Sequence, residues 1–223
     1  LARGLKPAKL EFMDAQTLAC VARYRGEPEP EPGTALLLVE LLGGHEAIEA
    51  DLRVVREVFS TAGAPEVLVA LDETEQEDLW SMRRDASPAI AGLKPLKVNE
   101  DVVVPRGRLP ELVARLERLR EDLDLLVPVF GHAGDGNLHV NIMYDPADVA
   151  DMARVERALD QLFTTVLQLG GSISGEHGIG VAKQPFIDRE LPAELLELSR
   201  RLKNRLDPNS LLNPAKIFPS TDR

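Results

Sequence analysis

Apolar residues recur at two different spacings along the chain, and the alternation between these spacings predicts a protein of mixed α and β structure. Residues 34–42 form an almost continuous apolar run closed by two glycines, which is typical of a buried strand. Residues 46–60 instead carry apolar side chains three and four positions apart, which predicts an amphipathic helix that buries one face. The same two patterns alternate through the rest of the chain.

Further strands and helices follow from these patterns. Short apolar or β-branched runs predict strands at 66–71, 101–105, 125–130 and 139–143. Apolar side chains at helical spacing predict helices at 74–84, 110–123, 148–169 and 192–206. Their order favours an α+β fold of ferredoxin-like type, which is an antiparallel sheet with helices packed on one face. Two such half-units can share one sheet or face each other.

No segment is long enough to link two separate domains, so residues 1–223 are expected to form one domain. The stretch at 27–33 alternates Glu and Pro before a glycine. This composition disfavours a helix and predicts an extended, solvent-exposed loop.

Composition narrows the classes of partner. The 223 residues carry 26 Lys and Arg against 37 Asp and Glu, a net charge of −11, which disfavours binding to a nucleic-acid backbone. The single cysteine, Cys20, excludes an internal disulfide and the multi-cysteine zinc patterns. No apolar run is long enough to span a bilayer. We expect a cytoplasmic protein, and peripheral attachment to the inner membrane is left open.

Three of the four histidines lie in two glycine-rich segments. Residues 131–141, GHAGDGNLHVN, predict a β-hairpin whose turn at 134–137 contains residue types that tolerate positive φ. A hairpin folds His132 back toward His139, and on a strand His139 and Asn141 project to the same face. We therefore expect two imidazoles and one amide at one end of a sheet.

The second segment, residues 171–180, joins a carboxylate and an imidazole, those of Glu176 and His177, with glycines on both sides. Glycine permits close approach of the backbone to a ligand. Consecutive residues of an extended segment point in opposite directions, so Glu176 and His177 are expected to serve two neighbouring sites. A solvated loop without a binding role is the alternative interpretation. The fourth histidine, His45, is assigned no role.

Two histidines and one carboxylate, those of His132, His139 and Glu176, make a ligand set that suits zinc or a borderline ion such as manganese or iron. Three protein ligands leave coordination positions open for a substrate, as in catalytic metal sites. His177 then remains free to act as a base. The sequence lacks the signatures of phosphate-binding loops, Rossmann domains and serine hydrolases.

Basic residues add a candidate anion site. Arg83 and Arg84 end a predicted helix, and Lys97 precedes a predicted strand. An arginine can hold a carboxylate through two parallel hydrogen bonds. The alternative is that the two arginines complement the dipole of their helix.

Several motifs together resemble a known family. The segments at 131–141, 175–180 (GEHGIG) and 206–216 (LDPNSLLNPAK) are similar to the C-terminal domain of FAD-linked 2-hydroxyacid dehydrogenases, and the segments at 79–83 and 100–105 fit the same family. These are relatives of D-lactate dehydrogenase, of the glycolate oxidase subunit and of D-2-hydroxyglutarate dehydrogenase, within the vanillyl-alcohol oxidase group. The resemblance implies a ferredoxin-like α+β fold. It also implies oxidation of a D-2-hydroxy acid to the 2-oxo acid by hydride transfer to flavin, with metal-assisted deprotonation of the 2-hydroxyl.

Members of that family carry an N-terminal FAD-binding domain, which nothing in this sequence resembles. The resemblance therefore implies that the chain is the substrate-binding cap, and that the FAD-binding domain of the same protein is its partner and holds most of the FAD. We expect the chain to be a fragment, since it begins with Leu1 rather than methionine. The resemblance implies that this fragment is inactive by itself. The electron acceptor and the oligomeric state, with a homodimer as one option, are left open.

The resemblance also implies roles for individual residues. His132, His139 and Glu176 match the family's ligands for a divalent metal, which we expect to be zinc or manganese. His177 matches the histidine that takes the proton of the substrate's 2-hydroxyl. Asn141 matches a residue beside the substrate.

Further residues match the family's contacts with substrate and flavin. Arg83 resembles the arginine that holds the substrate carboxylate, and Ser87 stands where one branch has a hydroxyl contact. Lys97 is matched to a lysine that contacts a second carboxylate, which in the D-2-hydroxyglutarate branch stands nearer the Val-Pro end of its strand. Asn213 and Lys216 lie in the closing motif that approaches the flavin.

Other functions are compatible with the same residues. One is a non-catalytic ferredoxin-like module that binds a small molecule, and another is a stand-alone metal hydrolase built on the two histidines and the glutamate. A third is a member of the family that needs no metal.

Overall fold

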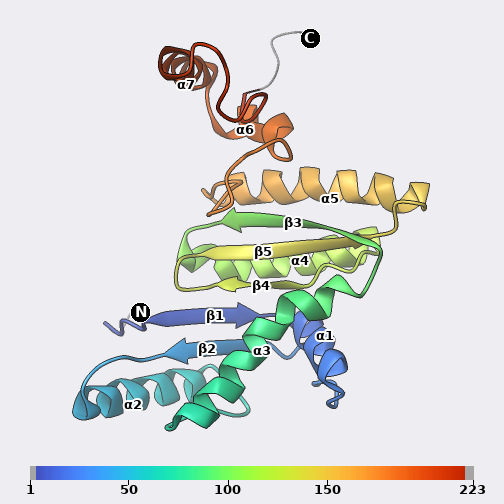
Figure 1. The fold of residues 1–223 in the computed structure, drawn as a ribbon. Coiled ribbons are helices and arrows are strands. Elements are labelled where there is room, and N and C mark those ends of the chain that lie inside the picture. The colour runs from blue at the N-terminus through green and yellow to red at the C-terminus, as the bar shows by residue number, and fades with distance from the viewer. Residues whose placement is uncertain (1–3, 219–223) are drawn as a thin grey trace.

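The computed structural model describes residues 4–218, in which five strands form one antiparallel sheet (Figure 1). The sheet order is β2-β1-β4-β5-β3. The strands are β1 (Lys9–Met13), β2 (Leu36–Glu40), β3 (Leu96–Val103), β4 (Val129–His132) and β5 (Asn137–Tyr144). Every neighbouring pair is antiparallel. The predicted α+β class with an antiparallel sheet is therefore confirmed.

All five predicted helices are present. The helices are α1 (Ala15–Arg25), α2 (His45–Thr61), α3 (Glu73–Ala91), α4 (Leu109–Leu123), α5 (Val149–Gln168), α6 (Ile187–Glu190) and α7 (Ala193–Leu206), of which α1 and α6 are additional to the prediction. For α2, α4, α5 and α7 the ends agree with the prediction to within one residue. Helix α3 continues past its predicted end and includes Pro88.

Alternate side chains of the central strands divide the interior into two parts. Leu138, Val140 and Ile142 of β5 are buried against α4 and α5 in the larger hydrophobic cluster. Met143 belongs to a second cluster, in which α1 and α3 meet Phe130 of β4. The α4–α5 layer follows the predicted packing of helices on one face. Helices α1 and α3 add a second group on the opposite face, because apolar residues occupy both sets of alternate positions there.

Polar side chains continue the second face beyond these apolar residues. The strand register pairs Asp101 of β3 with His139 of β5, and His139 with Phe130 of β4. Side chains of residues paired in this way project to the same face of a sheet. His132 lies two positions after Phe130 and shares that face as well. One face of the sheet thus carries the carboxylate of Asp101 and the imidazoles of His132 and His139.

Two predicted strands have other bounds in the structure, since β3 begins at Leu96 rather than 101 and β4 covers Val129–His132 rather than 125–130. Larger differences concern two regions. The strand predicted at 66–71 is wrong, because this segment is irregular and connects α2 to α3. It pairs with none of the described strands, so Leu68 and Leu71 remain exposed. Conversely, β1 and α1 were not predicted, because their residues show no clear apolar pattern. Strand β1 reads Lys-Leu-Glu-Phe-Met and buries its acidic residue, Glu11.

Figure 1 shows α6 and α7 beyond the β3 edge of the sheet. Leucines of α7 are exposed there, among them Leu198, Leu202 and Leu206. Within residues 4–218, no helix combines the length and the apolar character that crossing a membrane requires.

Candidate active site

Strands β4 and β5 form the predicted hairpin, which places His132 opposite Asn137. The turn spans 133–136, one residue earlier than predicted. Gly136 adopts a φ of 82°, and a side chain at this position would overlap the carbonyl oxygen of Val104. Only glycine fits such a turn. The turn therefore holds His132 next to His139 on the neighbouring strand.

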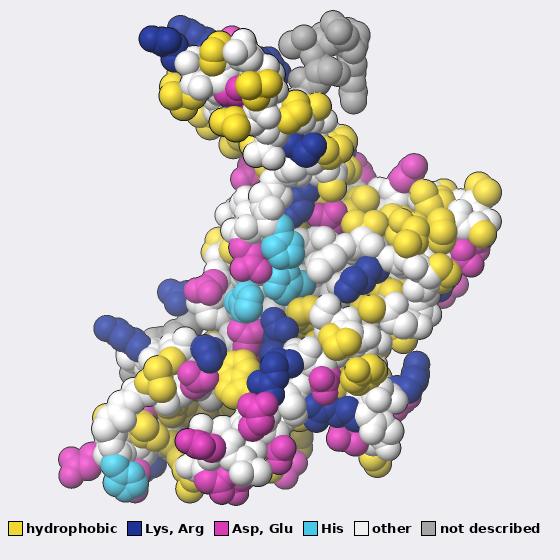
Figure 2. Space-filling view, in the orientation of Figure 1, with side chains coloured by type: hydrophobic (Ala, Val, Ile, Leu, Met, Phe, Trp, Pro, Cys, Tyr) yellow, Lys and Arg dark blue, Asp and Glu magenta, His cyan; other side chains and the backbone are white. Residues whose placement is uncertain are grey.

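His132, His139 and Glu176 meet at one point of the surface. Each offers one ligand atom, and these atoms lie within 4.8 Å of one another. Oε1 of Glu176 is 3.4 Å from Nε2 of His139 and 3.9 Å from Nε2 of His132. Figure 2 shows histidine side chains gathered beside acidic ones in the middle of the visible face. The predicted convergence is confirmed, whereas the role of the three residues as metal ligands stays a prediction.

His177 belongs to the same cluster. Its ring stacks on His139, with centroids 5.3 Å apart and planes inclined by 18°. Its Nε2 lies 3.5 Å from Oε1 of Glu176. The expectation that the side chains of Glu176 and His177 point in opposite directions, toward two neighbouring sites, is therefore wrong. It assumed an extended backbone, whereas the loop curls round a buried carboxylate.

That carboxylate belongs to Asp101, which is fully buried. Its Oδ2 accepts three consecutive backbone N–H groups, those of residues 175–177, at 2.8–2.9 Å, and the hydroxyl of Ser174 at 3.2 Å. Successive N–H groups that converge in this way form an anion-binding concavity. Burial acts to raise the pKa of Asp101, but the hydrogen bonds from Asn137 and the loop backbone outweigh it and hold the pKa well below its ordinary value. Asp101 is therefore ionised at neutral pH.

The loop is packed tightly against this anchor. A side chain at Gly175 would overlap the amide nitrogen of Asn137, and its Cβ would lie 2.7 Å from Oδ1 of Asp101. Nearby, the buried ammonium of Lys183 donates to the carbonyl oxygen of Asp101 at 2.6 Å and lies 3.5 Å from Oε2 of Glu100. Buried charges thus determine where the backbone of the loop lies.

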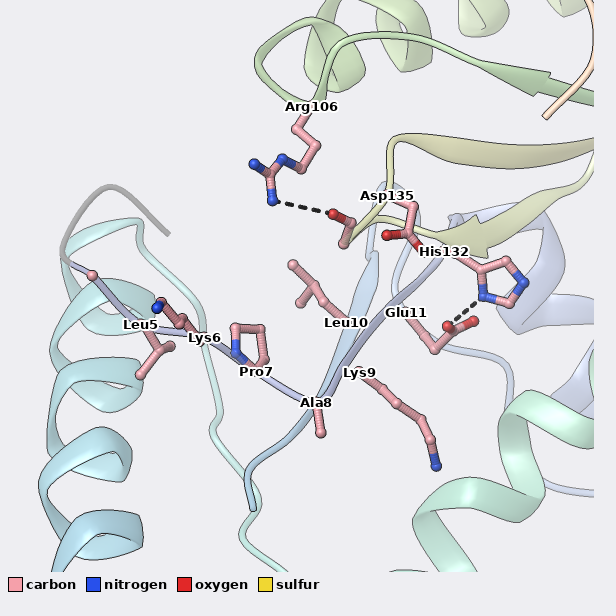
Figure 3. A pocket seen from close by; sticks show the side chains of 12 residues that line it. Leu5, Lys6, Pro7, Ala8, Lys9, Leu10, Glu11, Arg106, His132 and Asp135 are labelled. Carbon is pink, nitrogen blue, oxygen red and sulfur yellow. Dashed lines mark hydrogen bonds and ion pairs between the residues drawn. The ribbon is translucent and has the colours of Figure 1, made fainter. Parts of the chain in front are cut away.

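Glu11 of β1 joins two of the predicted residues. Its Oε2 accepts Nε–H of Arg83 at 2.6 Å. Its Oε1 is hydrogen-bonded to Nδ1 of His132 at 2.6 Å, a contact that Figure 3 shows. In the tautomer of His132 whose Nδ1–H donates to this carboxylate, Nε2 presents its lone pair to the cluster. The guanidinium of Arg83 also lies 4.5 Å from the centre of the Phe130 ring. The sequence analysis missed Glu11, and no motif around it distinguishes it from other acids.

The donor atoms of the cluster fit a divalent cation. Burial lowers the pKa of His139, which favours the neutral imidazole that a metal requires. Nδ1 of the same ring is buried and has no hydrogen-bond partner among the described residues. Together with Nε2 of His132 and a carboxylate oxygen of Glu176, the cluster offers the mixed nitrogen and oxygen ligands typical of catalytic zinc sites.

Asn141 and Lys97 lie on the face of the sheet that carries His139. Asn141 is buried, and its Nδ2 donates to the carbonyl oxygens of Pro128 and His139. Its Oδ1 has no partner in the part of the chain that the structure describes. Lys97 is paired in register with Met143, and its partial burial lowers the pKa of its ammonium group.

The other predicted residues are exposed on α3 and in the segment after α7. Ser87 is exposed on α3, one helical turn after Arg83. Asn213 and Lys216 are exposed in the irregular segment that follows α7. The backbone N–H of Ile217, which follows Lys216, donates to the carbonyl oxygen of Gly180 at 2.9 Å. This contact brings the segment next to the end of the loop that carries Glu176 and His177.

An open cavity of about 600 Å³ adjoins the cluster (Figure 3). It is lined by residues 4–11, Arg106, His132, Gly134 and Asp135. Its volume falls in the range of small-molecule sites. Glu11 and His132 line this cavity, so the cluster borders a space that a ligand or another domain can enter.

The chain is similar to known proteins along nearly its whole length. A family model described as FAD linked oxidases, C-terminal domain, matches residues 1–217. The glycolate oxidase subunit GlcD of Bacillus subtilis (strain 168) is 36% identical over 223 residues, which are 100% of this chain and 47% of that protein. The mitochondrial D-lactate dehydrogenase (cytochrome) of Arabidopsis thaliana is 29% identical over 218 residues, which are 97% of this chain and 38% of that protein.

A solved structure shares the fold. The 4-ethylphenol oxidase from Gulosibacter chungangensis matches with a TM-score of 0.64 at 17% identity, over 96% of this chain and 48% of that one. At this identity the likeness concerns the fold alone. The chain spans about half the length, or less, of the proteins that it matches.

Proposed function

The chain belongs to the family of C-terminal domains of FAD-linked oxidases, and from this premise we propose that it forms the substrate-binding part of an enzyme that oxidises a D-2-hydroxy acid to the 2-oxo acid. The observation that carries the proposal is the convergence of His132, His139 and Glu176 on one point of the surface. The imidazole of His177 lies beside this point, and the guanidinium of Arg83 is linked to it. A cation site, a base and an anion site together suit an acid whose hydroxyl must lose a proton.

The redox part of the reaction is proposed to belong to a domain outside this chain. The chain covers 47% of the glycolate oxidase subunit that it resembles. We propose that an N-terminal domain of the same protein holds most of the FAD. Asn213 and Lys216 are the residues of this chain proposed to face the flavin, because their exposed amide and ammonium groups can donate hydrogen bonds to its oxygens.

His132, His139 and Glu176 are the residues that would hold a divalent cation, with zinc or manganese as the proposed ions. When bound, such a cation polarises the substrate's oxygens and lowers the pKa of the 2-hydroxyl, and FAD accepts the electrons removed with the C2 hydrogen. Glu11 contributes by holding the ring of His132 so that Nε2 faces the cluster.

His177 is the proposed base. A neutral imidazole can take the proton of the 2-hydroxyl near pH 7. Nε2 of His177 lies 3.5 Å from Oε1 of Glu176, so the carboxylate stabilises the imidazolium that proton transfer produces. Backbone hydrogen bonds to Asp101 hold the loop, and with it the position from which the proton is taken.

Arg83 is proposed to bind the substrate carboxylate. Glu11 occupies its Nε–H, which leaves the two terminal nitrogens for a bidentate contact. The amide of Asn141 has an unpartnered oxygen in the described part of the chain, and this oxygen can accept a hydrogen bond from substrate. Lys97 and Ser87 are proposed to contact the far end of a longer acid, and Lys97 in particular a second carboxylate.

An assay of the flavin-containing protein that carries this chain tests the proposal. D-lactate, glycolate and D-2-hydroxyglutarate are each supplied with a dye as electron acceptor, and L-lactate serves as the stereochemical control. We expect oxidation of at least one of the first three acids, and a preference for D- over L-lactate of about 10-fold or more if lactate is used. Failure to oxidise any of them, combined with metal-dependent hydrolysis of an ester, would instead favour the hydrolase.

A further inference from the structure

We propose that Glu11 is a positioning residue that couples the carboxylate-binding arginine to the candidate metal centre, so that anion binding at Arg83 and cation binding at His132 strengthen each other. This inference rests on the proposed function, from which it takes the anion contact and the cation site. It concerns how the two contacts depend on one another.

The coupling element is one carboxylate with a different partner on each oxygen. Oε2 of Glu11 accepts Nε–H of Arg83 and Oε1 is bonded to Nδ1 of His132, both at 2.6 Å. The side chain of Glu11 is 8% exposed and that of Arg83 is 17% exposed. Hydrogen bonds to charged groups are stronger where water is excluded. A displacement of the arginine therefore moves the carboxylate and changes the orientation of the histidine.

Arg83 has the capacity to bind an anion while it holds Glu11. A guanidinium has five N–H groups. Within residues 4–218, the guanidinium of Arg83 makes its hydrogen bond to Glu11 through Nε–H, which leaves the terminal N–H groups for an anion. Packing on the Phe130 ring, at 4.5 Å, limits the rotation of the guanidinium. The terminal N–H groups are thus presented in a fixed direction that suits a carboxylate.

The sign of the coupling follows from charge. The positive charge of Arg83 offsets the field of Glu11 and opposes a cation near His132. A carboxylate bound to Arg83 neutralises that charge, so Glu11 acts more strongly on the imidazole and on the cation that it binds. By thermodynamic linkage, if the bound anion raises the affinity for the cation, the bound cation must raise the affinity for the anion by the same factor.

Titration calorimetry of Mn²⁺ binding measures this coupling directly. The flavin-containing protein is first freed of metal with a chelator, and Mn²⁺ is then titrated with and without propionate. Propionate has a carboxylate but lacks the 2-hydroxyl through which a substrate would contact the ion. Glu11→Gln keeps the size of the side chain and removes its charge. Glu40→Gln is the matched control, because Glu40 lies on the neighbouring strand β2 and pairs with Lys9 at 2.9 Å.

In the wild type we expect propionate to tighten Mn²⁺ binding by about 5-fold or more. Glu11→Gln should weaken Mn²⁺ binding by about 10- to 100-fold, as observed when groups that orient metal-binding histidines are removed. The propionate effect should then fall below about 2-fold, whereas Glu40→Gln should behave as the wild type. A propionate effect of unchanged size in Glu11→Gln would overturn the inference.

A second variant covers the case in which Glu11→Gln does not fold. Arg83→Lys keeps the charge but loses the Nε–H group that binds Glu11. The propionate effect on Mn²⁺ binding should fall below about 2-fold in this variant, because the group that binds the anion no longer contacts Glu11. A propionate effect of wild-type size in Arg83→Lys would also contradict the coupling. A wild-type protein that binds no Mn²⁺ at all would contradict the proposed metal site, and this outcome is distinct from Mn²⁺ binding without coupling.

Discussion

Oδ2 of Asp101 accepts the backbone N–H of His177 at 2.9 Å, and this contact holds the candidate base through its main chain. The imidazole of His177 is 48% exposed, so few side-chain contacts restrain it. The same oxygen accepts the backbone N–H of Glu176 at 2.8 Å. One buried carboxylate thus sets the positions of the base and of a candidate metal ligand together.

Replacing Asp101 with alanine should lower the free energy of unfolding by about 2–4 kcal/mol, because the N–H groups of the loop lose their acceptor. The change should reduce kcat more than it raises KM, since it displaces the base and leaves the carboxylate contact at Arg83 in place. Thermal unfolding and steady-state kinetics measure the two effects.

Asp101→Asn is the matched variant. It keeps one acceptor oxygen for the loop, and Oδ1 of Asn137, which has no partner among the described residues, can accept a hydrogen bond from the new amide. The decreases in the free energy of unfolding and in kcat should therefore both be smaller than in Asp101→Ala. An Asp101→Ala protein with the wild-type kcat would show that the base does not depend on this anchor.

Gly175→Ala should also displace the loop, through steric overlap rather than loss of charge. The added methyl group would overlap the amide nitrogen of Asn137. Gly178→Ala provides the contrast, because a Cβ there meets no atom within 4 Å and the cost arises from its φ of 78° alone. That cost is about 1–2 kcal/mol. We expect a lower melting temperature and lower kcat for Gly175→Ala than for Gly178→Ala, and equal effects would contradict the observed packing.

The parts of the site that the sequence revealed are local. The hairpin at 131–141 contains its own turn glycines and both histidines, so their proximity follows from strand pairing over a few residues. Helices α2, α4, α5 and α7 were predicted equally well because each repeats its apolar spacing over several turns. Such patterns require no knowledge of distant residues.

The parts that the sequence did not reveal depend on distant contacts. Glu11 and His132 are separated by 121 positions, and Asp101 and His177 by 76. The direction of the loop at 175–177 was predicted wrongly because the buried carboxylate that bends it lies on another strand. The apolar run at 66–71 resembles a strand, but whether it pairs depends on an available edge, which its own residues do not encode.

His177→Ala should lower kcat by about 10²- to 10⁴-fold, the usual contribution of a general base. Flavin content should stay at the wild-type level, because His177 lies on an exposed loop of this domain. His45→Ala is the control, since that imidazole is 88% exposed on α2 and outside the cluster. Absorbance of the bound flavin and the dye-coupled assay give both quantities. A fully active His177→Ala enzyme would require a different base.

Metal analysis addresses the cluster itself. The intact protein should contain about one divalent ion per chain, as expected of a single site with three protein ligands. His132→Ala should lose the ion and the activity, while His45→Ala should keep both. Dialysis against a chelator should abolish the activity, and added Zn²⁺ or Mn²⁺ should restore it. Retention of the full rate after complete removal of the ion would exclude the metal from the reaction.

The pH dependence of stability should report on Asp207, which ends α7 and holds the segment that carries Asn213 and Lys216. Its carboxylate pairs with Lys203 and accepts the backbone N–H groups of Leu211 and Leu212 at 2.9 Å each. The Lys203 contact, followed by these backbone bonds, lowers the pKa of Asp207 from 3.8 to about 2.

Because the pKa is lower in the folded state than in the unfolded state, the ionised carboxylate stabilises the fold above pH 3.8, and this contribution is lost as the pH falls toward about 2. The melting temperature of Asp207→Asn should therefore lie below that of the wild type by a constant amount between about pH 5 and about pH 7. The difference in melting temperature should shrink below about pH 4 and be largely lost near about pH 2. Glu156→Gln, which changes an exposed carboxylate on α5, should show no comparable profile. A difference between Asp207→Asn and wild type that persists unchanged at pH 2 would mean that the ionised carboxylate is not what holds this segment.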